Sequence, residues 1–189
     1  MRAAGGDFLP AIRKKCPDGS PAIPIIATFM GMDSTQFFGQ IRSGDLEGAR
    51  QSLKSHPDLV STRDPRGSTP LILASYYDHK DLVRLLLENG APVNEVDGSG
   101  NTALMGVCFK GYAEMAQILI GAGADVNARN GMGGTCLTFS VSFNRPEIVR
   151  LLLEAGADAS VRDAQGKTAL EHARNQGLAE MVALLETTR

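Results

Sequence analysis

The chain has 189 residues, 43% of them apolar and 21% charged, so it is long enough to bury the core of a single folded domain. Its 19 lysine and arginine residues nearly balance 21 aspartate and glutamate residues, and the net charge of −2 offers no general excess of positive charge for binding nucleic acid. The three cysteines include no Cys-x-x-Cys pair, which argues against a disulfide framework or a zinc site and favours a reducing, cytoplasmic location.

The first segment, residues 1–32, is predicted to be a flexible tail because it contains four of the nine prolines. Its apolar run, residues 22–32, is much shorter than the roughly 20 residues of a membrane-spanning helix, so no membrane contact is expected. The basic cluster at residues 13–15 precedes this run, which leaves a weak export signal as an alternative. A second alternative is a misassigned start, with translation beginning at Met30 or Met32.

The next segment, residues 33–63, is predicted to be a degenerate repeat that caps the N-terminal end of the domain. The triplet Gly44-Asp45-Leu46 and the later Leu53 match the second-helix pattern of the units that follow. No Thr-Pro-Leu motif precedes them, so the first half of this unit departs from the pattern.

Four regular units then follow with a period of 33 residues and no insertion. They are predicted to occupy residues 64–96, 97–129, 130–162 and 163–189, the last of them as a C-terminal cap. The turn sequence of residues 64–71 recurs at residues 97–104, 130–137 and 163–170. A constant period of this length indicates a repeat architecture.

Each regular unit is predicted to contain two short helices followed by a projecting turn. A threonine hydroxyl can cap the start of each first helix, at Thr69, Thr102, Thr135 and Thr168. The expected first helices cover residues 70–77, 103–110, 136–143 and 169–175. The expected second helices cover residues 80–89, 113–122, 146–155 and 178–186, and glycines end the first three. In the turns, Asn94 and Asn127 are expected to bond to their own backbone.

The units are expected to stack, because a single helix pair buries too few apolar side chains to offset the entropy of ordering its chain. Two leucine positions recur in every unit and predict two buried rows. The first row is Leu71, Leu104, Leu137 and Leu170, and the second is Leu86, Leu119, Leu152 and Leu185.

The motif of residues 69–74, together with Gly-Ala-Pro-Val-Asn at residues 90–94, resembles the ankyrin-repeat family, and the resemblance covers residues 33 to about 186. It implies an all-α solenoid of helix-turn-helix units with projecting β-turn loops, made of four repeats and the degenerate N-terminal capping repeat. Small bacterial ankyrin proteins similar to this one generally act as adaptors or accessory subunits. The family's usual histidine after Thr-Pro-Leu is absent from every unit, and three glycines predict that the turn of the third unit is the least stable.

In repeats of this type, the turn tips and the exposed side of the first helices form a concave face that binds a partner protein. The residues expected to contact the partner are Arg66, Tyr76, Tyr77, Ser99, Phe109, Lys110, Arg129, Met132, Phe143 and Arg162. Aromatic and arginine side chains often dominate binding energy, so this set predicts a partner with an acidic and partly apolar segment. The alternative for Phe109 and Phe143 is that they pack between repeats as part of the core.

No residues with catalytic or metal-binding spacing are found. His56, His79 and His172 fall in different units without a recurring cysteine or carboxylate, so no catalytic residue, metal or cofactor is expected. Cys108 and Cys136 are expected at small inward positions, with a redox switch between them as the alternative. The chain is therefore expected to be a protein-binding adaptor rather than an enzyme, and monomeric when free. A secreted effector or a scaffold using the same face is the alternative function.

Overall fold

The computed structural model of the chain describes residues 25–187, and the side chains from residue 34 onwards. Over that range the protein contains helices and turns but no β-strand. The helices are α1 (Ile25–Ser43), α2 (Leu46–Ser55), the 3-10 helix η1 (Pro57–Ser61), α3 (Pro70–Tyr76), α4 (Lys80–Glu88), α5 (Ala103–Lys110), α6 (Ala113–Gly121), α7 (Cys136–Ser142), α8 (Pro146–Glu154), α9 (Ala169–Asn175) and α10 (Ala179–Glu186). None of the helices in this part of the chain is long and apolar enough to cross a membrane.

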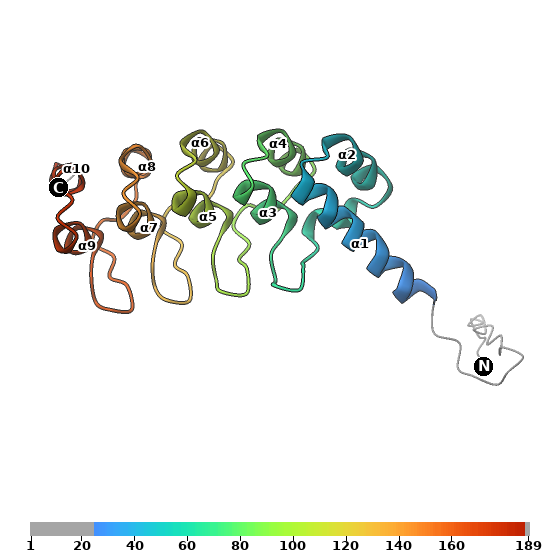
Figure 1. The fold of residues 1–189 in the computed structure, drawn as a ribbon, viewed down its shortest axis with the longest axis horizontal. Coiled ribbons are helices and arrows are strands. Elements are labelled where there is room, and N and C mark those ends of the chain that lie inside the picture. Colours follow the sequence, from blue (N-terminus) through green and yellow to red (C-terminus); the bar gives the residue numbers. More distant parts are fainter. Residues whose placement is uncertain (1–24, 188–189) are drawn as a thin grey trace, which may run out of the picture.

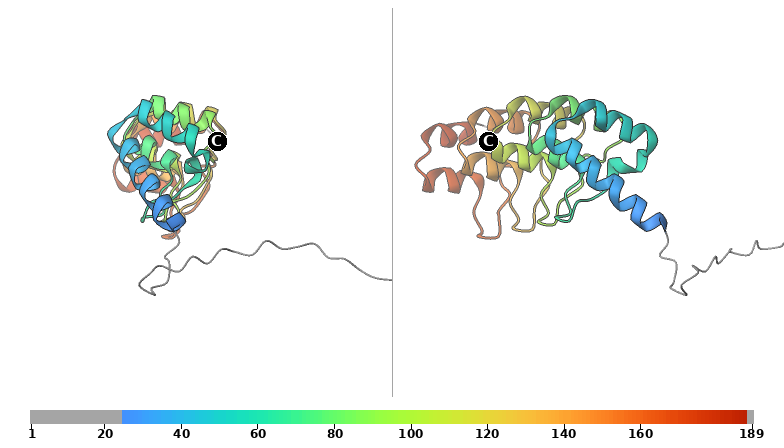
Figure 2. Two further views of the ribbon diagram at one scale, coloured as in Figure 1. Left: turned by 90° about the vertical axis from the view of Figure 1, so that its right-hand side faces the viewer. Right: turned by 45° about the vertical axis from the view of Figure 1, so that its right-hand side comes forward.

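The regular units form two layers of helices with turns projecting from one side (Figure 1). The first helices, α3, α5, α7 and α9, lie side by side in one layer, and the second helices, α4, α6, α8 and α10, form the other. The turns extend from the layer of first helices, all in the same direction, as the views in Figure 2 show. The fold is therefore the predicted all-α solenoid of helix-turn-helix units.

The N-terminal unit departs from this pattern. Its first helix, α1, has 19 residues and packs against α2 and α3, with Phe37 and Ile41 fully buried. Because α1 begins at Ile25, residues 25–32 are helical, whereas the sequence analysis assigned them to a flexible tail. No proline follows Pro24 until position 57, so nothing in the sequence interrupts this helix. Residues 1–24, which include the basic cluster of the alternative export signal, lie outside the described residues.

The regular first helices begin as the threonines predict. The hydroxyl of Thr102 accepts a hydrogen bond from the backbone N–H of Met105, and the other three capping threonines make the same bond. The expected bounds of α5 and α9 are confirmed, whereas α3 and α7 end one residue early. The reason is that Asp78 and Asn144 adopt left-handed conformations, with φ of 58° and 53°, soon after these two helices end.

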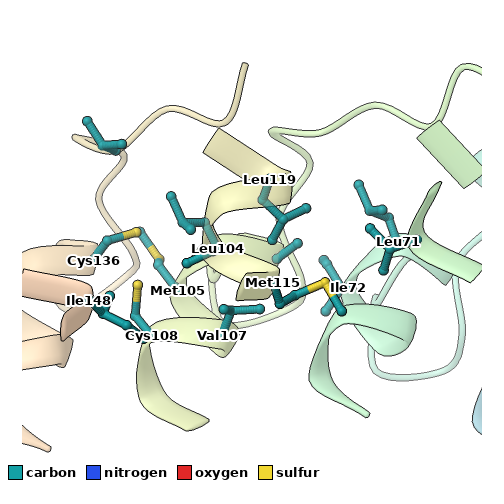
Figure 3. Close-up of a cluster of buried hydrophobic side chains, with 14 of the residues drawn as sticks. Leu71, Ile72, Leu104, Met105, Val107, Cys108, Met115, Leu119, Cys136 and Ile148 are labelled. Carbon is teal, nitrogen blue, oxygen red and sulfur yellow. The ribbon is translucent and has the colours of Figure 1, made fainter. Parts of the chain in front are cut away.

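Both predicted leucine rows are confirmed. All eight side chains are buried, with at most 9% of their surface exposed. Figure 3 shows that the buried side chains continue from one unit to the next. Leu104 and Leu119 of one helix pair lie between Leu71 of the preceding unit and Ile148 of the following unit. The core is therefore continuous along the stack, and each unit depends on its neighbours.

Cys108 and Cys136 are fully buried between successive first helices, as expected for small apolar residues (Figure 3). A hydrogen bond to the Cys108 thiol, together with burial, raises the pKa of the Cys136 thiol well above its ordinary value. Since disulfide formation requires a thiolate, this environment gives no support to the redox alternative.

Candidate protein-binding surface

The projecting turns share one hydrogen-bond pattern that holds their tips in place. In the turn of the second unit, Oδ1 of Asp97 accepts the backbone N–H groups of Ser99 and Asn101 at 2.8 and 2.9 Å. The same two bonds recur at Asp64, Asn130 and Asp163. The recurring Asp or Asn therefore shapes the turn and leaves the side chains at its tip free to vary.

Neighbouring turns are also bonded to one another through three of the residues predicted to bind a partner. The backbone carbonyls of Arg66, Ser99 and Met132 accept the N–H of the following turn at 3.1, 3.2 and 3.0 Å. Their side chains lie at the exposed tips, where 67% of the Met132 surface is accessible. The turns thus form a connected edge with varied side chains along it.

Two further predicted contact residues, Arg129 and Arg162, take part in internal bonds. Nη2 of Arg129 donates to the backbone carbonyl of Arg162 at 2.6 Å. Arg162 in turn donates to the carbonyl of Gly166 and to the Glu171 carboxylate, at 2.6 and 3.0 Å. Each guanidinium has five N–H groups, so these bonds orient the arginines along the turn edge and occupy only part of their donors.

Asn94 and Asn127 do not bond to their own backbone, and that expectation was wrong. Oδ1 of Asn127 accepts the backbone N–H of Asp158 at 2.8 Å, and its Nδ2 donates to the carbonyl of Gly156 at 3.2 Å. Asn94 bonds to Asp125 and to Gly123 at the same distances. These asparagines bridge one unit to the next, because the turn of each unit lies beside the end of the following second helix.

The predicted aromatic residues lie on the surface. Phe109 and Phe143 are 38% and 43% exposed, so the alternative that placed them in the core is wrong. Tyr76 and Tyr77 are similarly exposed. The cause is their place at the last turn of each first helix, beyond the leucines that face the neighbouring units.

These side chains contact one another from unit to unit. The ring of Phe109 packs edge-to-face on that of Phe143, with the ring centres 4.5 Å apart. Nζ of Lys110 lies 4.6 Å from the centre of the Tyr76 ring, which in turn packs against Tyr77. We call these five residues, Tyr76, Tyr77, Phe109, Lys110 and Phe143, the aromatic ridge. It runs along α3, α5 and α7, none of which contains an acidic residue.

A pocket of about 260 Å³ opens at the end of the ridge, between the third and fourth units. Phe139, Phe143 and Met132 supply much of its apolar wall. Sequence reasoning missed Phe139, because an aromatic residue in the middle of a first helix is most simply read as core. The available signal was its spacing from Ser142: Phe139 lies about one helical turn before Ser142, and the two preceding units carry an aromatic residue at the position of Ser142.

His172 forms part of the same pocket, and it is paired with a carboxylate that the sequence analysis did not assign to it. Nε2 of His172 lies 2.6 Å from Oδ2 of Asp163. Burial raises the pKa of Asp163, but hydrogen bonds from His172 and from the N–H groups of Lys167 and Gln165 outweigh it and hold this pKa below its ordinary value. Among the described residues, no three His, Cys, Asp or Glu side chains come together in a way that could hold a metal ion.

Comparison with known families agrees with this geometry. A family model described as ankyrin repeats (3 copies) matches residues 39–130 and residues 107–187. The two overlapping matches extend over well more than half of the chain and include every regular unit of helices.

Proposed function

The chain belongs to the ankyrin-repeat family, whose members are generally protein-protein interaction modules, and from this we propose that it binds another protein through its concave face as an adaptor or accessory subunit. The family is typically non-enzymatic. We include in the proposal that this chain has no catalytic activity of its own, acts in the cytoplasm and is monomeric when free.

The observation that carries the proposal is the aromatic ridge. Large apolar side chains in contact with one another, yet more than a third exposed, are characteristic of surfaces that a partner covers. In contrast, Arg84 and Arg150 on the second-helix layer form ion pairs with Asp81 and Glu180, so that surface is already matched in charge. The ridge is the more suitable face for a hydrophobic partner.

The charge of the ridge supports a partner segment that is acidic as well as partly apolar. Lys110 contributes a positive charge in the middle of the ridge, and Arg66 contributes another at an exposed turn tip. A carboxylate of the partner would find no opposing acid on the three ridge helices. Electrostatic complementarity of this kind speeds association and selects among partners.

The test begins with affinity capture of a partner from the cells that express the chain, followed by measurement of binding with the purified pair. Tyr77→Ala and Phe109→Ala should each weaken binding by about 1–3 kcal/mol, as expected for a hot-spot residue. Gln117→Ala, an exposed change on the second-helix layer, is the matched control and should leave affinity unchanged. If both ridge variants bind as tightly as the wild type, the site lies elsewhere.

A secreted effector or a scaffold would use the same face and remains the alternative. Cell fractionation separates an effector from a cytoplasmic adaptor, because only the effector would leave the cell. Light scattering of the purified chain separates a scaffold, which would self-associate, from the proposed monomer.

A further inference from the structure

The ridge follows a pairing rule that connects each unit to the next. In each of the first three regular units, one side chain lies seven residues after the capping threonine: Tyr76, Phe109 and Ser142. Its partner belongs to the next unit and lies eight residues after the capping threonine of that unit. Tyr76 is paired in this way with Lys110, and Phe109 with Phe143, as their contacts show. In the third unit the rule is broken, because the residue at this position is a small serine.

The structure also indicates what a ring at this position would cover. A Cβ atom built on Gly106 would lie 3.9 Å from Cδ2 of Tyr76, so this ring lies over the middle of the next first helix. The residue equivalent to Gly106 in the fourth unit is His172. A ring at the place of Ser142 would therefore lie over the His172 imidazole.

The pocket between the third and fourth units opens at this place. Ser142 and His172 are both in its wall, together with the rings of Phe139 and Phe143. Its volume of about 260 Å³ is below the range of roughly 300–1,000 Å³ for pockets that hold drug-sized molecules, so it suits a single large side chain. Three rings in the wall favour an aromatic occupant, since edge-to-face and offset contacts between rings add to the burial of apolar area.

We propose that this pocket is an anchor site for one aromatic side chain of an acidic partner segment, and that the partner's ring takes the place that Tyr76 and Phe109 hold in the preceding units. This inference rests on the proposed function and names the partner's chemistry. The occupant is a ring because Tyr76 and Phe109 place rings at this position in the preceding units, where the third unit has Ser142.

The charge along the ridge fits an acidic segment. Lys110 contacts the Tyr76 and Tyr112 rings, and no carboxylate among the described residues lies within ion-pair distance of its ammonium group. The one acid in the pocket wall, Asp163, is already bonded to His172 and to two backbone N–H groups. Lys110 does not line the pocket, so the acidic residue that pairs with it lies further along the partner segment, where the segment follows the ridge from the anchor toward α3.

The experiment uses the full chain and two synthetic peptides as probes. The peptides, Ac-Asp-Glu-Phe-Glu-Asp-NH2 and the same sequence with Gly in place of Phe, are titrated into ¹⁵N-labelled protein and followed by NMR. We expect the Phe peptide to shift the amide signals of Ser142, Phe143 and His172, and to bind at least tenfold more tightly than the Gly peptide. No shift at millimolar Phe peptide, or equal binding of the two peptides, overturns the proposal.

A pair of variants locates the bound ring. Ser142→Phe fills the pocket with the chain's own ring and should reduce Phe-peptide binding at least tenfold. Asn175→Phe makes the same change at the equivalent position of the last unit, which is exposed and does not line this pocket, and should bind like the wild type. Equal binding by Ser142→Phe and wild type overturns the proposal. The comparison of the two peptides on wild-type protein needs no variant and decides the question if Ser142→Phe does not fold.

The captured partner separates this inference from the function on which it rests. If the partner loses affinity with Phe109→Ala but binds Ser142→Phe as tightly as wild type, it uses the ridge and not the pocket, and only the anchor proposal fails. If neither change affects the partner, the concave-face function fails with it.

Discussion

The asparagines that bridge neighbouring units allow a quantitative test of how the repeats are joined. Asn127→Ala removes two bonds to the following unit, the one accepted from Asp158 and the one donated to Gly156. A hydrogen bond contributes about 0.5–1.5 kcal/mol net, and the exposure of this site places each bond near the lower end of that range. The expected loss in the free energy of unfolding is therefore about 1–2 kcal/mol, or a fall of about 2–8 °C in Tm for a chain of this size.

Urea denaturation of three variants would measure this loss. The aspartate of Asn127→Asp keeps an oxygen that can accept the N–H of Asp158, but it has no N–H group to donate to the Gly156 carbonyl. Its loss of unfolding free energy should lie between zero and the loss of Asn127→Ala or, because the added negative charge faces a carbonyl, be close to that of Asn127→Ala. Asn175→Ala, an exposed change in the last first helix, is the matched control and should change stability by less than about 0.5 kcal/mol. If Asn127→Ala is no less stable than Asn175→Ala, these bonds do not contribute to holding the units together.

Three further expectations concern the core, the pH dependence and the local stability. Leu119→Ala should cost about 2–5 kcal/mol in unfolding free energy, because this fully buried side chain has a unit on either side, and an unchanged denaturation midpoint would contradict the packing. The lowered pKa of Asp163 means that its carboxylate stabilises the fold at neutral pH and that this contribution is lost as the pH falls below about 4. Tm measured against pH should thus fall more steeply for wild type than for Asp163→Asn, and parallel curves would show that the pair with His172 has no such role. In hydrogen exchange, residues 132–143 should be less protected than residues 104–119, because glycines weaken the third turn.

Much of the fold could be predicted from the sequence because one set of local rules is repeated four times. A threonine cap begins each first helix, a left-handed residue follows its end, and a glycine follows each of the first three regular second helices. Each rule depends on residues within one or two turns of chain, and the constant period then aligns Leu104 with Leu137 without further information. The first helix was less predictable, because α1 has neither a capping threonine nor a constant length to define where it begins.

The features that could not be predicted depend on contacts between units. The sequence shows that Asn94 and Asn127 recur, but only the spacing of adjacent units shows that their side chains reach the end of the following second helix. The exposure of Phe109 likewise depends on the rotation of α5 about its axis, which the apolar pattern leaves open because α5 is apolar on most sides. The ridge residues were identified from their position in the unit, whereas the pocket was missed because it arises from a side chain that is small.

Each unit uses one set of positions to pack against its neighbours and another set to form the exposed ridge. This separation explains how a repeated fold can carry a surface that differs from unit to unit. The leucines of the first row are the second residues of the first helices, whereas the ridge residues lie at the helix ends and contact one another and nearby surface residues such as His79 and Tyr112. A change such as Ser142→Phe therefore alters the surface without removing any contact of the leucine rows. Since stability is approximately a sum over neighbouring units, the effect of a change at one ridge position is confined to its own unit and the adjoining ones. Under the anchor proposal, the serine that interrupts the ridge serves partner binding, and no contact of the leucine rows requires it.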